Sequence, residues 1–61
     1  MNVFQNLRIK KELTQEQVAT LLSVDRSTVA KWETGVSLPR NSLLPQIAKL
    51  FNCKIEDLLK R

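Results

Sequence analysis

A linker of only three residues between two short helical patterns limits most strongly how this chain can fold. Amphipathic spacing runs through residues 15–22 and again through 26–33, and only Ser23-Val24-Asp25 lies between them. Consecutive helices joined by so short a linker cross each other, which predicts a helix-turn-helix. The second helix then presents side chains that can hydrogen-bond to base edges and phosphates, namely Arg26, Ser27, Thr28 and Lys31.

Capping signals mark the ends of these two helices. Thr14 and Gln17 have the spacing of a capping box, so the first helix is expected to begin directly after Thr14. Asp25 is the expected N-terminal cap of the second helix, Arg26–Thr34, and Gly35 is its expected C-terminal stop. The motif therefore has a predicted beginning, turn and end.

Two further helical patterns flank the motif, one on each side. Asn2 is positioned to cap an N-terminal helix that buries Phe4 and Leu7. On the other side a helix is predicted to begin near Asn41 or Ser42, and its apolar positions recur at helical spacing: Leu44, Ile47, Ala48 and Phe51. Both flanks are thus predicted to pack on the central pair.

The end of the chain contributes a fifth helix to the prediction. Pro45 is tolerable in the preceding helix only in or next to its first turn, and Asn52 suits a left-handed C-terminal position. A short helix over Ile55–Lys60 is then expected to dock Ile55 and Leu58 on the rest. With no alternating strand pattern, the 61 residues predict an all-α, compact bundle of five short helices in a single domain, 1–61.

Charge and composition agree with a nucleic-acid partner but do not require one. Ten Lys and Arg against six Asp and Glu give a formal charge of +4, which attracts polyanions and is also found on merely soluble basic surfaces. No apolar run approaches a membrane span, and no signal-peptide pattern opens the chain. A single cysteine, Cys53, cannot form an internal disulfide, so a cytoplasmic location is expected.

Trp32 could stack on a base or belong to the core. Its spacing from Val29 puts it on the inner face of the helix, so a core position is expected. A chain this short also needs most of its large apolar side chains for folding.

Beyond these patterns, the chain resembles the phage repressor and Cro type of helix-turn-helix regulator, often called the XRE family. The resemblance covers nearly the whole chain and runs through Leu7-Arg8, Leu13–Glu16, Val18-Ala19, Trp32–Gly35, Pro39, Leu44, Ala48, Phe51 and Ile55–Leu58. It implies a lambda-repressor-like DNA-binding domain of a transcriptional regulator, with repression as the expected direction.

Two positions depart from the family pattern. Ser23 stands where the family usually has glycine, at a turn position that commonly needs a positive φ, and Lys54 stands where a Ser or Thr cap is frequent. Leu21 lies on a helix face that is usually exposed, and the pattern does not explain it. None of these departures changes the fold that the resemblance implies.

The resemblance also implies roles for individual residues. Arg8 and Glu33 are similar to a partly buried ion pair that joins the first helix to the recognition helix, with Arg8 also near a phosphate. The second helix of the motif is expected to lie in the major groove, while the first crosses the backbone, and base contacts are expected from Arg26, Ser27, Thr28 and Lys31. Phosphate contacts are expected at two helix starts, from Thr14 and Gln15 and from Arg40, Asn41 and Ser42.

One such domain covers few base pairs, so the resemblance implies a homodimer on double-stranded DNA with a near-palindromic operator. Because the chain has no separate dimerisation domain, dimerisation off DNA is expected to be weak, with Leu59 and the segment around Cys53 as candidate contacts. No membrane contact and no small-molecule ligand are expected.

Other function classes fit less well. The chain has no His, no Gly-rich phosphate loop and no cluster of metal ligands, so neither an enzyme nor a cofactor or metal is expected. The alternative is a protein-interaction module, such as the DNA-binding antitoxin or scaffold part of a complex, because a fold does not fix a function. The polar face of the second motif helix favours DNA over this alternative.

Overall fold

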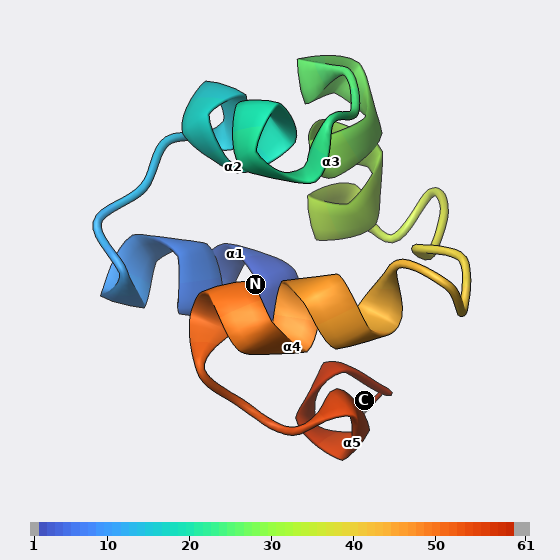
Figure 1. Ribbon diagram of the computed structural model, residues 1–61. Coiled ribbons are helices and arrows are strands. Elements are labelled where there is room, and N and C mark those ends of the chain that lie inside the picture. Colours follow the sequence, from blue (N-terminus) through green and yellow to red (C-terminus); the bar gives the residue numbers. More distant parts are fainter. Residues whose placement is uncertain (1, 60–61) are drawn as a thin grey trace.

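The computed structural model describes residues 2–59, and within them the chain forms five helices and no strand. They are α1 (Val3–Lys10), α2 (Gln15–Leu22), α3 (Arg26–Thr34), α4 (Leu44–Phe51) and α5 (Ile55–Leu59). Helices α2 and α3 lie on one side of α1 and α4, and α5 lies on the other side (Figure 1). The all-α, five-helix architecture predicted from the sequence is confirmed.

The first two helices begin where the capping patterns predicted. The Asn2 side chain accepts a hydrogen bond from the Gln5 backbone N–H at 3.2 Å and so caps α1. At the start of α2 the capping box is complete: Thr14 Oγ1 accepts from the Gln17 N–H at 3.0 Å, and Gln17 Oε1 accepts from the Thr14 N–H at 2.8 Å. Local polar side chains therefore set both helix starts.

The recognition helix has its predicted bounds, but one detail of its start was wrong. Asp25 occupies the N-cap position with an extended backbone, yet its side chain makes no capping hydrogen bond. The boundary thus follows from the short turn and not from an Asp25 carboxylate bond. At the other end Gly35 has φ 82°, the left-handed conformation expected of a C-terminal glycine.

The start of α4 was predicted too early. Residues 41–43 form a turn, and α4 begins at Leu44 with Pro45 in its first turn. The reason is the missing N–H of Pro45, because a helix starting near Asn41 would need that group to donate to the Asn41 carbonyl. The Leu44 N–H donates to this carbonyl instead, at 3.3 Å, which closes a tighter turn.

Helix α5 buries fewer side chains than the sequence predicted. Leu58 is buried at 2% exposure, as expected, but Ile55 is 38% exposed and does not dock. A helix of five residues makes little more than one turn, so the side chain at its first position remains at the rim. The Lys54 N–H donates to the Asp57 side chain at 3.1 Å, and Lys60, the predicted last residue, lies outside the described part.

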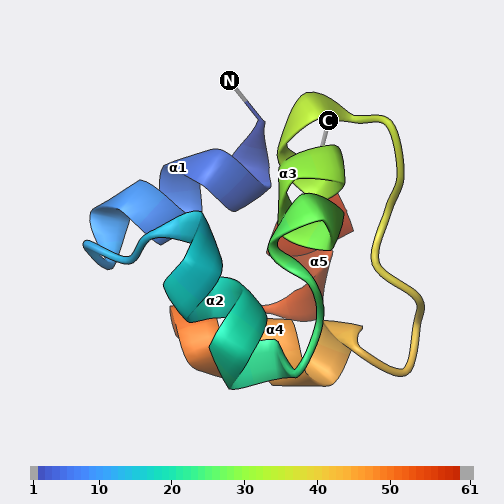
Figure 2. The same ribbon diagram turned by 90° about the horizontal axis from the view of Figure 1, so that it is seen from above.

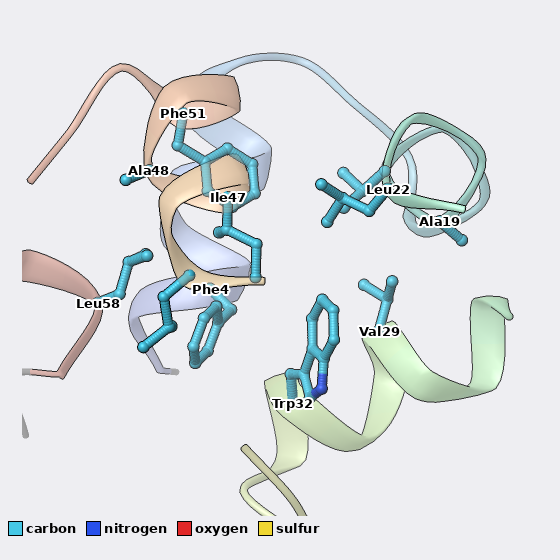
Figure 3. Close-up of a cluster of buried hydrophobic side chains, with 11 residues drawn as sticks. Phe4, Ala19, Leu22, Val29, Trp32, Ile47, Ala48, Phe51 and Leu58 are labelled. Carbon is cyan, nitrogen blue, oxygen red and sulfur yellow. The ribbon is translucent and has the colours of Figure 1, made fainter. Parts of the chain in front are cut away.

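A single core joins all five helices (Figure 3). Trp32 is only 4% exposed and packs against Phe4 with ring centroids 6.1 Å apart, so its expected core position is confirmed. The small Ala19 side chain, 3% exposed, lets α2 and α3 approach closely. The buried apolar residues are Phe4, Val18, Ala19, Leu22, Val29, Trp32, Leu44, Ile47, Ala48, Phe51 and Leu58.

Three non-glycine residues within the described part of the chain adopt a left-handed backbone. Ser23 has φ 59°, so the turn of the motif takes the positive φ expected at this position although it lacks glycine. Asn52 has φ 54°, also as expected. Glu12, with φ 58°, adopts the same conformation within the connection between α1 and α2, which the sequence did not indicate. None of the helices in residues 2–59 is both long and apolar enough to cross a membrane.

Candidate nucleic-acid interface

Helix α3 turns its apolar side to the core and its polar side to solvent. Val29 and Trp32 are buried, whereas Arg26, Ser27 and Lys31 are exposed. Thr28 is half-buried at the edge of this polar face. Seen from above, α2 lies beside α3 and no helix in the described part of the chain lies over α3 (Figure 2). The four candidate base-contacting residues thus belong to one accessible surface.

Two hollows flank this surface, and each collects residues that were predicted to touch phosphates. The first lies between α1, α2 and the start of α3, and it is lined by three predicted phosphate contacts, Arg8, Thr14 and Gln15, and by one predicted base contact, Arg26. The second lies between the turn, α3 and the segment before α4, and it includes Thr28, Arg40 and Ser42. Asn41 lies between Arg40 and Ser42 in the sequence and is exposed, but it does not line the second hollow.

The structure places Arg8 and Glu33 in a two-pronged ion pair. Arg8 Nε lies 2.6 Å from Glu33 Oε2, and Arg8 Nη2 lies 3.1 Å from Glu33 Oε1. The Arg8 and Glu33 side chains are 14% and 4% exposed. The hydrogen bond to Glu33 raises the pKa of Arg8 above its ordinary value, while burial works in the opposite direction. Arg8 is therefore a permanent cation at the junction of α1 and α3.

Arg8 has a further partner that the sequence did not indicate. Its Nη1 donates to the Leu13 carbonyl at 2.8 Å, in the connection that leads into α2. One guanidinium thus holds α1, this connection and α3 together. A backbone carbonyl leaves no signal in the side-chain pattern, so this contact could not be found from the residues.

Gln15 joins the ion pair to the recognition helix. Its Nε2 donates to Glu33 Oε1 at 3.2 Å, and its Oε1 accepts from Arg26 Nη1 at 3.3 Å. Gln15 and Arg26 are the first residues of α2 and α3. The spacing of the motif does not indicate this pairing, because it depends on the angle at which α2 and α3 cross.

Comparison with known families decides what this arrangement belongs to. A family model described as helix-turn-helix matches residues 4–58, which include most of α1, all of α2, α3 and α4, and most of α5. The chain belongs to this helix-turn-helix family. The resemblance to phage-repressor-type regulators is confirmed, and with it the expected class of function, a DNA-binding domain of a transcriptional regulator.

Relatives of this helix-turn-helix domain are named as regulators. The chain is 46% identical over 55 residues to the HTH-type transcriptional activator BcrR of Enterococcus faecalis, covering 90% of the chain and 27% of the activator. It is 40% identical over 57 residues to an uncharacterized HTH-type transcriptional regulator of Methanocaldococcus jannaschii, covering 93% of the chain and 86% of that protein.

A third relative is named as a repressor and not as an activator. The cryptic phage CTXphi transcriptional repressor RstR of Vibrio cholerae is 29% identical over 55 residues, which are 90% of the chain and 50% of the repressor. The helix-turn-helix domain therefore spans about a quarter of one named relative and half of another. Activator and repressor share this domain, so the domain alone does not determine the direction.

Backbone N–H groups remain open at the edges of both hollows. At the start of α2 the capping box uses the N–H groups of Thr14 and Gln17, and in the described residues those of Gln15 and Glu16 have no acceptor. In the turn before α4, the N–H groups of Asn41 and Ser42 are likewise without one. Such groups can bind phosphate oxygens at each position.

The described residues offer little for other chemistry. No group of three or more His, Cys, Asp or Glu side chains in residues 2–59 could hold a metal ion. Burial and the Asp57 charge raise the pKa of the half-buried Cys53 thiol, which keeps it protonated and unreactive. The chemistry of this surface is thus that of hydrogen bonds and positive charge.

Proposed function

We propose that the domain represses transcription by binding, as a homodimer, a near-palindromic operator in double-stranded DNA. Helix α3 lies in the major groove, and α2 crosses the backbone beside it. The observation that carries this proposal is the exposed polar face of α3, with Arg26, Ser27 and Lys31 outside and Trp32 inside. Flanking hollows with open N–H groups support the same orientation.

Base contacts are assigned to the polar face of α3. Arg26 and Lys31 are exposed cations that can donate to guanine O6 and N7. Ser27 is exposed and can donate or accept, and the half-buried Thr28 reaches a base edge only from the rim of the second hollow. We therefore expect Arg26 and Lys31 to contribute most of the direct readout.

Phosphate contacts are assigned to the two hollows. In the first, the helix start at Thr14 and Gln15 offers N–H groups and the positive end of a helix dipole, and Arg8 also lines this hollow. In the second, Arg40, Asn41 and Ser42 provide a guanidinium, an amide, a hydroxyl and backbone donors. Contacts on both sides of α3 fix its register along the groove.

A single domain covers only a few base pairs, which is the reason for proposing a two-fold symmetric dimer. Two copies place their α3 helices about 34 Å apart, one helical turn of DNA. Leu59 is 59% exposed and Cys53 is half-buried, so both remain candidates for a small contact between copies. A small contact is consistent with a dimer that forms mainly on DNA.

Repression then results from occupancy of a promoter and needs no further chemistry. We propose that the domain acts without catalysis, cofactor or small-molecule ligand, in the cytoplasm, where it meets operator DNA. Its named relatives include a transcriptional activator and a phage repressor. An operator placed beside the promoter, and not over it, would give activation with the same contacts.

The experiment that tests this proposal begins with selection of bound sites from a random duplex pool. On the selected site, Arg26→Ala should cost about 1–3 kcal/mol at one base pair and relax the preference there. Arg40→Ala should weaken binding to all sequences alike and reduce the salt dependence. The reverse result would exchange the two roles, and failure to select any site would overturn DNA reading by α3.

Sedimentation with and without the selected duplex tests the dimer. We expect a monomer in free solution and two copies on one duplex with two half-sites. One copy per duplex would contradict the two-fold arrangement while leaving the base contacts intact. Binding to random duplex that does not fall with salt would instead favour the protein-interaction alternative.

A further inference from the structure

The Asn2 side chain makes a hydrogen bond at each of its two polar atoms, and the partners belong to different helices. Its Oδ1 accepts from the Gln5 backbone N–H at 3.2 Å, which caps α1. Its Nδ2 donates to the Trp32 carbonyl in the last turn of α3. The start of α1 lies beside the end of α3 (Figure 2), and this one side chain joins them.

The Trp32 carbonyl needs a partner because of the way α3 ends. Carbonyls in the last turn of a helix lack the N–H group that would follow four residues later in a longer helix. For Trp32 that group belongs to Val36, but beyond the left-handed Gly35 the Val36 N–H donates to the Lys31 carbonyl instead, at 3.0 Å. The backbone of residues 2–59 then offers the Trp32 carbonyl only the Gly35 N–H, at 3.4 Å. The Asn2 amide supplies the donor that this helix end lacks.

Two further contacts between α1 and this turn involve side chains. Phe4 packs against the Trp32 ring with centroids 6.1 Å apart, and Arg8 binds the Glu33 carboxylate. A side chain can rotate about its own bonds while the helix that carries it shifts. A carbonyl moves only with the helix backbone, because the peptide unit is planar. The bond from Asn2 therefore restrains the position of the turn itself.

The capping of α1 does not by itself require asparagine at position 2. Asp, Ser and Thr also accept hydrogen bonds from the first N–H groups of a helix. Asparagine carries an NH₂ group in addition, whereas an ionised aspartate of the same shape has acceptors only. The bond to Trp32 thus uses a donor that the capping role does not need.

We propose that Asn2 is a positioning residue, which holds the Trp32 carbonyl and thereby places the last turn of α3 for the base contact of Lys31. The inference rests on the proposed function, because it assumes that Lys31 contacts a base. Lys31 is exposed and directly precedes Trp32, so a shift of the Trp32 backbone moves Lys31 with it. A base contact of this kind tolerates displacements of only about 0.5 Å. Arg26 begins α3 directly after the short turn from α2, at the other end of the helix, and depends less on Asn2.

The test compares Asn2→Asp with Asn2→Ala. Asn2→Asp keeps the shape and the acceptor that caps α1 but removes the donor to Trp32, whereas Asn2→Ala removes both. Asn6→Asp is the matched control, because Asn6 is exposed on the same helix and the change in charge is the same. Dissociation constants are measured for the site selected by the wild type and for its single base-pair variants.

Discrimination is compared at two base pairs, one identified by Lys31→Ala and the other by Arg26→Ala. We expect Asn2→Asp and Asn2→Ala to reduce discrimination at the Lys31 base pair by about fivefold, the effect of one hydrogen bond. Discrimination at the Arg26 base pair should change by less than about twofold, and Asn6→Asp should match the wild type at both. In the Lys31→Ala background, Asn2→Asp should cause no further loss.

Three results with DNA would overturn the proposal. A loss in Asn2→Ala that is absent in Asn2→Asp would reduce Asn2 to a cap of α1. An equal loss at both base pairs would mean that Asn2 does not act on the last turn of α3 in particular. A further loss in the Lys31→Ala background would show that its effect does not pass through Lys31.

Amide hydrogen exchange without DNA separates this inference from the proposed function. In Asn2→Asp the Gly35 and Val36 N–H groups should exchange about fivefold faster than in the wild type, because the last turn of α3 opens more easily. The Gln5 N–H should keep its wild-type rate in Asn2→Asp and lose protection only in Asn2→Ala. The Val24 N–H, which donates to the Ala19 carbonyl at 2.9 Å in the other turn, is the internal reference and should not change in Asn2→Asp.

Unchanged exchange at Gly35 and Val36 in Asn2→Asp would overturn the positioning role even if the domain reads DNA. Faster exchange at all four N–H groups would do the same, because it reports a loss of global stability and not a local opening. A wild-type protein that selects no site would instead overturn the proposed function and the reading role of Lys31. The exchange rates would then still decide whether Asn2 holds the end of α3.

Discussion

The Arg8 guanidinium binds both oxygens of the Glu33 carboxylate, with Nε 2.6 Å from Oε2 and Nη2 3.1 Å from Oε1. The two residues are 25 positions apart and join α1 to the end of the recognition helix. Because both side chains are largely removed from solvent, the desolvation cost offsets much of their attraction. The pair therefore matters more for the placement of α3 than for net stability.

Removal of one partner should nevertheless be costly. We expect Glu33→Ala to lower the free energy of unfolding by roughly 3 kcal/mol, because the Arg8 charge then remains desolvated without its partner. The same variant should weaken DNA binding, since α3 and the Gln15 amide lose their anchor. Urea denaturation and binding to the selected duplex measure the two effects.

The control for this prediction is an exposed carboxylate far from the pair. Glu56→Ala on α5 should change the free energy of unfolding by less than about 0.5 kcal/mol. If Glu33→Ala unfolds and binds like the wild type, the ion pair has neither a structural nor a positioning role.

The left-handed residue in the turn offers a stabilising change. Ser23 has φ 59°, which costs a residue with a Cβ about 1 kcal/mol relative to glycine. Ser23→Gly should therefore raise the free energy of unfolding by somewhat less than this amount, measured by urea denaturation. Asn52→Gly, at φ 54°, is the matched control and should gain less, because asparagine tolerates this conformation. Equal gains at both positions would contradict the explanation.

The sequence predicted those features that depend on neighbours in the chain. The capping box at Thr14, the stop at Gly35 and the inner face of Val29 and Trp32 all follow from local spacing. The predicted start of α4 was too early. A helix that begins near Asn41 needs the N–H of residue 45 as donor to the Asn41 carbonyl, and Pro45 has no N–H.

The sequence identified the residues of the candidate site but not the hydrogen bonds between them. Arg26 and Gln15 were identified singly, one for bases and one for phosphates, whereas the structure joins them through a hydrogen bond. The left-handed Glu12 and the Arg8 contact to the Leu13 carbonyl involve the backbone, for which side-chain patterns give no signal. Such contacts depend on how helices cross and require coordinates.

The two N-terminal caps of the motif should differ in strength. Thr14→Ala removes the hydroxyl that accepts from the Gln17 N–H, so we expect a loss of about 1 kcal/mol in the free energy of unfolding. Asp25→Ala should lose clearly less, because the Asp25 side chain makes no capping bond. Urea denaturation of the two variants side by side tests this, and a larger loss for Asp25→Ala would show that its carboxylate caps α3 in solution.

Cys53 should make stability depend on pH in the alkaline range. Burial, followed by the Asp57 charge, raises the pKa of its thiol in the folded protein. The unfolded chain then loses the thiol proton at a lower pH than the folded one. The stabilising contribution is complete below the ordinary thiol pKa of about 8.5 and is lost as pH rises through the higher folded pKa.

Cys53→Ala removes this dependence and provides the comparison. Between about pH 8 and pH 10, the wild type should lose more stability than Cys53→Ala in urea denaturation under a reductant. Lysine titration affects both proteins equally and cancels in the difference. Parallel pH profiles would show that the folded thiol titrates like an unfolded one.

Glu16 should oppose DNA binding while it supports α2. Its exposed carboxylate lies in the first turn of α2, where it interacts favourably with the helix dipole but lies beside the proposed phosphate site. Glu16→Gln should therefore lower the free energy of unfolding by about 0.5 kcal/mol and tighten binding to every duplex by up to about fivefold at low salt. The gain should shrink as salt screens the repulsion, whereas Glu56→Gln on the distant α5 should leave affinity unchanged. Weaker binding by Glu16→Gln would mean that no phosphate lies at the start of α2.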